Sequence, residues 1–346
     1  MEKITDAYYE SQWNLKLMNV PFAWDISMGE GATIGLFDSG VDASHKDLGW
    51  DTDIFLTSVD SESARKAKYQ PVLNVIKAGK HPKILSGWNV IADNDDTYDD
   101  YRHGTSLAGI MVADIDGEGI VGVAPKSKIR PYKVIDNRGW GYQDKVAEAV
   151  ADAIDDRVNV MNFSLAWDSE DCKGMTDNIK EAIKQGIIVC CAVGNNNKEK
   201  IMYPASIEGV IRVGGCNAVG KRWVHNTKLG SNYGDGMTFL APADSQITTQ
   251  YMRSRYEPKE GTSMACANAS GVMALVKAVR PAIDNKDILR YYEQFAFDKD
   301  TGHGILNAYD LLTYFTEQPH NDKLQNALIL LDQLKTAILE LQGTNK

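Results

Sequence analysis

The stretch ATIGLFDSGVD, residues 32–42, indicates the fold class of this chain. It is an apolar run of strand length that ends at Asp38, and a Ser-Gly turn follows it. Similar runs recur to about residue 240, with helical patterns such as Tyr142–Ile154 and Met175–Gln185 between them. This alternation predicts an α/β fold with three layers, in which a mostly parallel sheet carries helices on both faces. The predicted strands are Thr33–Phe37, Ile129–Val134, Val158–Phe163, Ile187–Val193, Val210–Gly214 and Met237–Leu240.

The composition limits the class of protein. The chain has 346 residues, of which 43% are hydrophobic, so it can bury a sizeable core in one domain with an appendage. Its formal net charge of −10 argues against a nucleic-acid partner, because phosphate binding needs clustered Lys and Arg in excess. From the sequence we expect no membrane span.

Two features predict the compartment. The first residues, MEKITDAYYESQWNLKLMNV, lack the basic region, apolar run and small-residue cleavage site of a secretory signal. The five cysteines are an odd number, and the neighbours Cys190 and Cys191 would point to opposite faces of a strand. We therefore expect reduced thiols and a cytoplasmic protein.

Two segments interrupt the alternating pattern and define the predicted domains. Residues 50–83 form an insertion within a domain that spans residues 1–312, and the part Arg65–Lys83 is rich in Lys and Arg. We expect a solvated surface segment here, although binding of a partner or gating of a site stays open. Residues 313–346 form a helical tail whose apolar seam could dock on its own domain or mediate self-association. The seam positions are Ala327, Leu331, Leu334, Ile338 and Leu341.

Three residues of the types that nucleophilic catalysis requires follow a strand or begin a helix. Asp38 follows a predicted strand, His103 opens the run HGTSLAGI, and Ser263 opens a helical run in EGTSMACANASG. A serine hydroxyl is a weak nucleophile, so it needs an imidazole base and a carboxylate that orients the base. Each residue also has an ordinary structural explanation, as a turn aspartate, a packing or capping histidine, and an N-cap serine.

The order of these motifs and their flanking residues resembles the subtilisin-like serine proteases, or subtilases. The family's Asp-Ser-Gly, followed by His and Asp-Leu, corresponds to DSGVDASHKDL at 38–48. Its His-Gly-Thr with a later Gly-Val-Ala-Pro corresponds to 103–125, and its Gly-Thr-Ser-Met-Ala corresponds to 261–265. The resemblance covers about residues 12–312 and implies a serine endopeptidase that acts on a protein or peptide substrate.

The resemblance also implies a role for each catalytic candidate. Ser263 would attack the peptide carbonyl, His103 would take and return the proton, and Asp38 would fix the imidazole tautomer. The oxyanion that develops needs preorganised donors, and the family supplies a side-chain amide from an Asn after a buried strand. CCAVGNNN places Asn195 there, so we expect Asn195 and the Ser263 N–H to form an oxyanion hole.

A substrate cleft is implied in the same way, with an extended peptide pairing as a strand between two segments. MNFSLAWD would line the first specificity pocket, and DNRGWGY would form the opposite wall. Ala166 replaces a common Gly and Met202 falls near the expected pocket floor, so we expect a medium-sized uncharged residue before the cleaved bond. The candidate substrate-binding residues are Gly139, Trp140, Gly141, Ser164, Leu165, Ala166 and Met202.

Calcium is the expected cofactor, because many family members hold one Ca²⁺ near the His helix. Gln12, Asp47 and Asp116, the last in the loop DIDGEG, occupy corresponding positions and offer the oxygen ligands that this cation prefers. Without an ion the loop would be an ordinary solvated turn. The Asp-rich stretch DNDDTYDDYR at 93–102 could hold a second ion, but we expect it to be solvated.

Other functions remain possible for this scaffold. In a transpeptidase an incoming amine would replace water, and only the products distinguish the two reactions. A noncatalytic module would bind peptides in the same groove, but such modules usually lack one member of the triad. An esterase of the α/β-hydrolase type is disfavoured, because the serine motif is GTSMA rather than G-x-S-x-G and the residue order is Asp, His, Ser.

Overall fold

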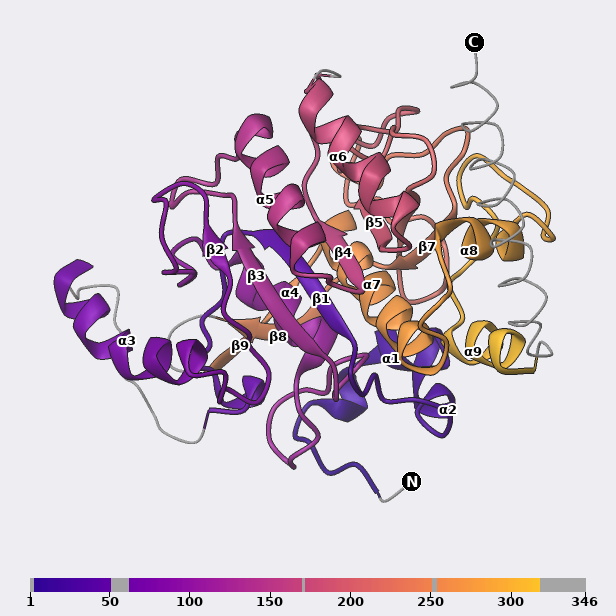
Figure 1. The fold of residues 1–346 in the computed structure, drawn as a ribbon. Helices are drawn as coiled ribbons and strands as arrows, with labels where there is room; N and C mark the ends of the chain where they lie inside the picture. The colour runs from indigo at the N-terminus through magenta and orange to yellow at the C-terminus, as the bar shows by residue number, and fades with distance from the viewer. Residues whose placement is uncertain (1–2, 51–61, 170–171, 251–253, 318–346) are drawn as a thin grey trace, which may run out of the picture.

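The structure, a computed structural model, describes residues 3–50, 62–169, 172–250 and 254–317. Seven parallel strands form one sheet in the order β2-β3-β1-β4-β5-β6-β7, with helices on both faces (Figure 1). The predicted three-layer α/β fold is therefore confirmed. The strands are β1 (Thr33–Asp38), β2 (Trp88–Asn89), β3 (Lys128–Lys133), β4 (Val160–Phe163), β5 (Ile188–Ala192), β6 (Ile211–Cys216) and β7 (Phe239–Pro242).

The helices divide between the two faces of the sheet. Helices α4 and α7 pack together against one face of the sheet, and helices α5 and α6 pack together against the opposite face. The helices are α1 (Trp13–Leu17), α2 (Val20–Ala23), α3 (Glu62–Lys77), α4 (His103–Val112), α5 (Gln143–Asp155), α6 (Lys173–Lys184), α7 (Thr262–Val279), α8 (Asn285–Tyr292) and α9 (Ala308–Glu317).

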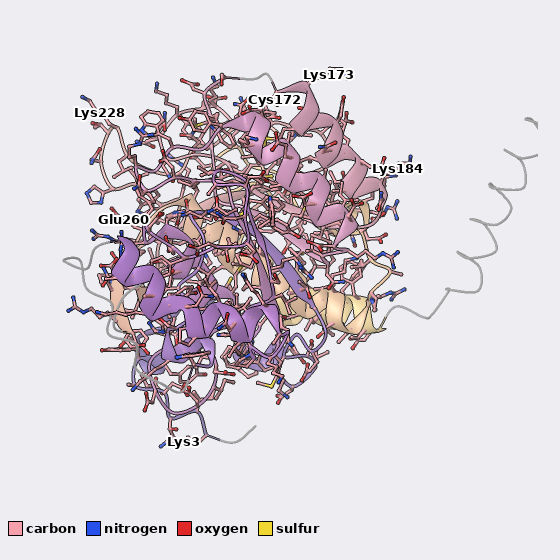
Figure 2. The ribbon with its side chains drawn as sticks, turned by 60° about the vertical axis from the view of Figure 1, so that its left-hand side comes forward. Lys3, Cys172, Lys173, Lys184, Lys228 and Glu260 are labelled. Atoms are coloured by element: carbon pink, nitrogen blue, oxygen red, sulfur yellow. The ribbon has the colours of Figure 1, made fainter. Side chains whose placement is uncertain are left out.

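Each face of the sheet has its own hydrophobic core, because successive side chains of a strand point to opposite faces. Cys190 belongs to the core beneath α4 and α7, and Cys191 to the core beneath α5 and α6, as their adjacent positions predict. All five cysteines are free thiols. Four are buried, and Cys172, at the start of α6, is partly exposed (Figure 2).

Helix α7 has the length and apolar composition of a membrane span. It is the one helix in the described ranges that is long and apolar enough to cross a membrane, although the sequence predicted none. Most of α7 is buried inside the protein, where it contacts β4, β5, β6 and β7. Its apolar composition is therefore explained by its place as the central core helix.

Strand β2 and a separate hairpin were not predicted. The hairpin pairs β8 (Gln246–Gln250) with β9 (Arg255–Lys259) in antiparallel register and lies against α4. Its contact with α4 is polar, because the hydroxyls of Thr248 and Thr249 donate to backbone carbonyls in the first turn of that helix. A polar strand of this kind lacks the apolar run by which the other strands were found.

The insertion at 50–83 is only partly the solvated segment that was expected. Residues 51–61 lie outside the described ranges, and α3 follows them at the edge of the molecule (Figure 1). One face of α3 is buried in the core beneath α4 and α7 through Tyr69, Val72, Leu73 and Ile76. The prediction was therefore wrong for this face, because an amphipathic helix packs on the domain.

The predicted domain boundary at residue 312 falls inside a helix. Helix α9 continues from Ala308 to Glu317, and Leu311, Leu312 and Phe315 are buried against the domain. The predicted seam at 327–341 lies outside the described residues.

Candidate active site

The carboxyl end of β1 and the first residue of α4 bring Asp38 and His103 together. Both Asp38 oxygens lie 2.9 Å from Nδ1 of His103, and Asp38 is fully buried. The backbone N–H of Ser39 donates a second bond to Oδ1 of Asp38, at 2.8 Å. Asp38 is thus more than a turn residue, and the tautomer with hydrogen on Nδ1 leaves Nε2 of His103 as a base.

The electrostatics of His103 follow from this contact. Burial lowers the pKa of the imidazole, but the charge of Asp38 and its hydrogen bond raise it, and the net shift is upward. The Asp99 carboxylate also raises the pKa, whereas Lys259 opposes the shift. The site therefore stabilises the protonated form of His103.

A second buried carboxylate, Asp99, lies behind this pair, although no motif of the sequence points to it. The hydroxyl of Ser39 lies 2.8 Å from Oδ1 of Asp99 and 3.2 Å from Oδ1 of Asp38, so it links the two carboxylates. Asp99 also accepts bonds from the backbone N–H and the hydroxyl of Thr105, in the first turn of α4. The expectation that 93–102 is solvated is therefore wrong for Asp99, which is fully buried.

Ser263 lies in the first turn of α7, but it does not cap the helix. Gly261 occupies the N-cap position, with a φ of 127° that favours glycine. The Ser263 hydroxyl is nearly buried and donates to the carbonyl oxygen of Ser164 at 3.2 Å. Ser164 in turn donates from its hydroxyl to the carbonyl of Ser263 at 2.9 Å, which fixes the start of α7 against the end of β4.

The sheet register relates this serine to the Asp38–His103 pair. Leu36 of β1 is in register with Asn162 of β4, and two residues later the same edge carries Asp38 and Ser164. His103 is bound to the first of these, and Ser263 to the second. His103 and Ser263 thus each contact one of two neighbouring strand ends. In the described structure the Ser263 hydroxyl bonds to Ser164 and makes no hydrogen bond to His103, so the side chain of Ser263 must rotate away from Ser164 to reach the imidazole.

Asn195 follows β5, the next strand along the same edge. Its Oδ1 accepts bonds from the backbone N–H and the hydroxyl of Thr262, both at 2.8 Å. These bonds fix the orientation of the amide, so its Nδ2 hydrogens are directed away from Thr262. An amide held in this way beside the N-terminal turn of α7 is a preorganised donor.

The candidate cleft residues lie on two walls that approach each other. Trp167 pairs with Tyr203 through backbone bonds of 2.8 and 3.2 Å, and its ring borders Gly141 from the opposite wall. The thioether of Met202 packs against Gly194, next to Asn195.

Exposure separates the remaining cleft candidates. Ser164 and Leu165 are buried and Ala166 is exposed, at the end of β4. The Trp140 side chain is 66% exposed, so it stands at the rim of the opposite wall rather than inside a pocket. The ring of Tyr101 packs on Gly139 of this wall, a contact that the sequence analysis missed.

The calcium candidates form a hydrogen-bonded group around the loop at 114–119. The Gln12 amide both donates to and accepts from the backbone of Val121 at 2.8 Å, so it clamps the chain. Asp47 accepts from the Ile120 N–H and from the hydroxyl of Tyr256. Asp116 accepts from the Glu118 N–H at 2.9 Å.

Asp6, which the sequence analysis did not single out, completes this group. Its Oδ1 accepts from the Asp116 N–H at 3.2 Å, whereas its Oδ2 is buried without a hydrogen-bond partner. Burial raises the pKa of Asp47 to about 7, and the charges of Asp116 and Asp6 add to this rise. The Oδ2 atom of Asp6 has no hydrogen-bond partner and the neighbouring carboxylates repel one another, so a bound cation would stabilise this group. In the described residues, no three His, Cys, Asp or Glu side chains are arranged around one metal position.

The fold and this set of side chains define a serine hydrolase built on a parallel α/β sheet. A model of the subtilase family, peptidase S8, matches residues 29–311. The chain therefore belongs to the subtilase family and is a serine endopeptidase. Relatives of this family include extracellular and intracellular proteases.

Individual relatives agree with this assignment. Thermitase of Thermoactinomyces vulgaris is 30% identical over 318 residues, which cover 89% of this chain and 99% of thermitase. The major intracellular serine protease of Bacillus subtilis (strain 168) is 26% identical, over 76% of this chain and 74% of that protein. A solved structure of a protease from Pseudoalteromonas arctica, with a TM-score of 0.73 and 22% identity over 90% of this chain and 99% of that chain, shares the fold.

Proposed function

We propose that this subtilase cleaves peptide bonds with Ser263 as the nucleophile, His103 as the base and Asp38 as the orienting carboxylate. The main support is the contact of both Asp38 oxygens with Nδ1 of His103, at 2.9 Å. This contact leaves Nε2 to accept the proton of the Ser263 hydroxyl as Oγ attacks the substrate carbonyl. The Asp38 charge stabilises the imidazolium that results.

The remaining steps use the same groups. His103 returns its proton to the leaving amine, and a water then attacks the acyl-enzyme with His103 again as base. During both attacks negative charge develops on the carbonyl oxygen. The Nδ2 amide of Asn195 and the backbone N–H of Ser263 would donate to it, because the bonds from Thr262 hold Asn195 in one orientation before the substrate binds.

We also propose an uncharged, medium-sized substrate residue before the cleaved bond. Ala166 and the buried Met202 support this preference, since a methyl group and a thioether narrow the pocket and make it apolar. The substrate is a protein or peptide.

Calcium is proposed as a structural cofactor at the loop 114–119, in a family of which many members bind it. Gln12, Asp47 and Asp116 would hold the ion together with backbone carbonyl oxygens, and the ion would neutralise the charge of Asp6 beside them. Saturating Ca²⁺ should raise the melting temperature by about 5 °C, and chelation should reverse this rise. Asp6→Asn should abolish the shift. An equal melting temperature in Ca²⁺ and in chelator would contradict the site.

A cytoplasmic location is supported by the five free thiols, which fit a reducing compartment. Fractionation of the native host with a specific antibody tests it, and signal confined to the medium would refute it. For the tail, the apolar seam at 327–341 supports a contact with a second copy. Light scattering of the full chain should then show a dimer or larger oligomer, and a monomer at high concentration would contradict this.

The test of the reaction is a peptide library digested by the wild type and by Ser263→Ala, with products identified by mass spectrometry. We expect cleavage by the wild type with free carboxyl termini, and loss of cleavage in the variant. Products joined to an added amine would instead identify a transpeptidase. A folded wild type that binds peptides without cleaving any would identify a binding module.

A further inference from the structure

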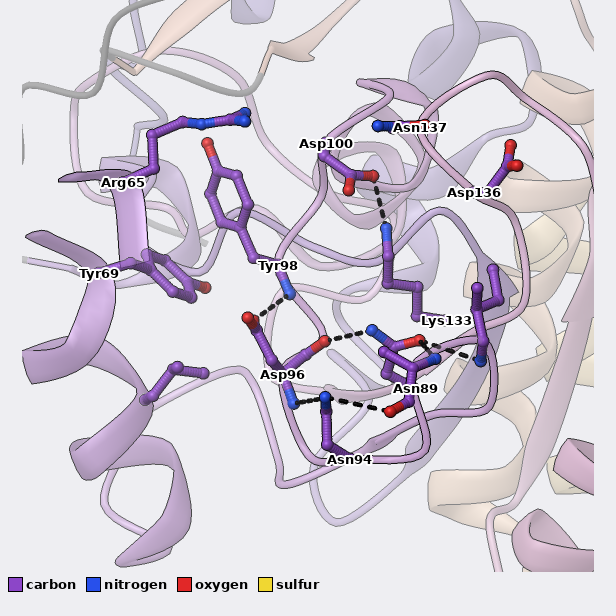
Figure 3. Close-up of a pocket in the computed structure, with 13 residues that line it drawn as sticks. Arg65, Tyr69, Asn89, Asn94, Asp96, Tyr98, Asp100, Lys133, Asp136 and Asn137 are labelled. Atoms are coloured by element: carbon purple, nitrogen blue, oxygen red, sulfur yellow. Dashed lines mark hydrogen bonds and ion pairs between the residues drawn. The ribbon is translucent and has the colours of Figure 1, made fainter. Parts of the chain in front are cut away.

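A cavity of about 290 Å³ separates α3 from the loop that follows β2 (Figure 3). Helix α3 contributes Arg65, Tyr69 and Leu73 to its lining, so the inserted segment forms one wall. The other walls come from the loop and from the end of β3. Their lining residues are Asn89, Ile91, Ala92, Asn94, Asp96, Tyr98, Asp100, Lys133, Asp136 and Asn137.

This cavity adjoins the candidate active site. A second hollow is lined by His103 and Lys259, and it shares Asp100 and Asn137 with the first. Asn137 also lies two residues before Gly139 in the cleft wall. A peptide bound along that wall would therefore pass the mouth of the cavity.

The direction of the substrate side chains follows from an extended peptide. Successive side chains of a strand point to opposite sides. If the residue before the cleaved bond points into the pocket at Ser164–Ala166, the preceding residue points the other way, toward His103 and Asp100. The cavity thus faces the second residue before the cleaved bond.

The cavity is preorganised on both sides. The Tyr69 hydroxyl accepts from the Ala43 N–H at 2.9 Å and donates to Val41, which fixes α3 to the loop after β1. Across the cavity, Oδ1 of Asn89 accepts from two backbone N–H groups, those of Ile91 and Ala92. The wall is therefore held by its own bonds and does not need a ligand to form.

Charge pairing singles out Asp96 within the lining. Asp100 is paired with Lys133 at 2.6 Å, and Asp136 is paired with Arg138 at 3.0 Å. Asp96 has no ion-pair partner in the described ranges, and its Oδ1 accepts a bond from the Tyr98 N–H at 3.2 Å. One carboxylate oxygen of Asp96 therefore keeps its capacity to accept a bond from a ligand.

The surrounding charge favours a cation at this position. Five aspartates lie within residues 93–100, and the whole chain carries a net charge of −10. The only cation of the lining without an ion-pair partner in the described part of the chain is Arg65 (Figure 3). Tyr69, Leu73, Ile91 and Ala92 supply apolar surface for an aliphatic stem.

We propose that the cavity is a specificity pocket for a Lys or Arg side chain at the second position before the cleaved bond, with Asp96 as its anchor. The proposal rests on the peptidase function proposed above. In this proposal the inserted helix α3 contributes to substrate selectivity, because it forms one wall of the pocket.

The test compares peptides that differ only at this position, with Lys, norleucine, Gln or Glu. Norleucine matches the aliphatic stem of Lys without its charge. The wild type should cleave the Lys peptide with a kcat/KM about tenfold above that for norleucine, which is the size of a half-buried ion pair. Asp96→Asn should reduce the ratio to about one by lowering kcat/KM for the Lys peptide.

The matched control is Asp95→Asn, because Asp95 pairs with Lys77 and does not line the cavity. This variant should keep the tenfold ratio. Arg65→Ala should increase the ratio, since it removes a like charge. Equal rates for Lys and norleucine in the wild type, or a preference for Glu that is lost in Arg65→Ala, would overturn the proposal.

Cleavage of the norleucine peptide reports the peptidase function by itself. If this peptide is cleaved and the Lys peptide has no advantage, the pocket proposal fails while the peptidase function stands. Binding supplies a readout without turnover: Ser263→Ala should bind the Lys peptide about tenfold more tightly than the norleucine peptide in calorimetry. Equal affinities would overturn the pocket even if every peptide is cleaved.

Discussion

The edge of the sheet that carries Asp38 and the pocket beside α3 are close neighbours, but they are built differently. Asp38, Ser164 and Asn195 lie at or just after the ends of three adjacent strands of the core, and the bonds that hold them connect strand ends to helix starts. The pocket beside α3 is walled by a surface helix and a loop whose polar groups mainly bond to one another. The candidate catalytic residues of this chain therefore lie on the rigid core, whereas the pocket proposed for selectivity depends on an insertion.

The largest effect should come from Asp38→Asn, which acts on the chemistry for every substrate alike. Loss of the carboxylate disturbs the tautomer of His103, so kcat should fall by about 10⁴-fold for both Lys and norleucine peptides. If kcat is nearly retained and the ratio of kcat/KM between the Lys and norleucine peptides changes instead, the assignment of catalysis and selectivity to separate regions is wrong.

The pH dependence of the same pair provides a second readout. Because the net effect of burial and Asp38 raises the pKa of His103, kcat/KM should increase with pH through a midpoint above that of an ordinary imidazole. The base is active only when neutral, so activity is lost as pH falls through this midpoint. In Asp38→Asn the midpoint should move to lower pH, and an unchanged midpoint would contradict the assignment.

A smaller effect is expected at the neighbouring strand end. Asn195→Ala removes one donor to the developing oxyanion, so kcat should fall by about 10² to 10³-fold while KM changes little. Steady-state kinetics with a peptide ester and a peptide amide measure kcat and KM separately. An equal loss through KM alone would show that Asn195 binds the ground state instead.

Asp99 should have a more modest effect, because it acts through Ser39 and not on the substrate. Asp99→Asn removes a charge that raises the pKa of His103, so the midpoint of the kcat/KM profile should shift downward and kcat should fall by about tenfold. Asp93→Asn is the control, since Asp93 lies on the exposed part of the same loop. Identical pH profiles for the two variants would exclude Asp99 as a positioning residue.

The smallest effect is expected from thiol reagents. Cys266 lies three residues after Ser263, but it is fully buried, and burial raises its thiol pKa well above the ordinary value. Native enzyme treated with iodoacetamide should keep its activity and become modified only at Cys172. Inactivation that maps to Cys266 would show that α7 opens far more readily than its packing suggests.

Much of the fold and of the site was predictable because the relevant residues carry local patterns. The strands β1, β4 and β5 are apolar runs, and Asp38, His103 and Ser263 each stand in a short motif. Asp99 carried no such pattern, since its burial depends on how the loop folds onto Ser39 and Thr105. The sequence therefore predicted that Asp38 and His103 come together, but not that the Asp99 carboxylate lies behind them.

The face of α3 was missed for a different reason. Tyr69, Val72, Leu73 and Ile76 follow the spacing of a helical face, so a signal for burial was present. The charge of Arg65–Lys83 outweighed it in the prediction. The β8–β9 hairpin and the bonds that Thr262 donates to Asn195 depend on tertiary contacts, which no local pattern reports.

The most direct measurement is labelling of the folded chain with a fluorophosphonate, followed by intact mass spectrometry and peptide mapping. We expect one adduct in the wild type, located at Ser263, with a labelling rate that collapses in His103→Ala and Asp38→Asn. A correctly folded wild type that stays unlabelled, or an adduct at another serine with unchanged rates in these variants, would contradict the account.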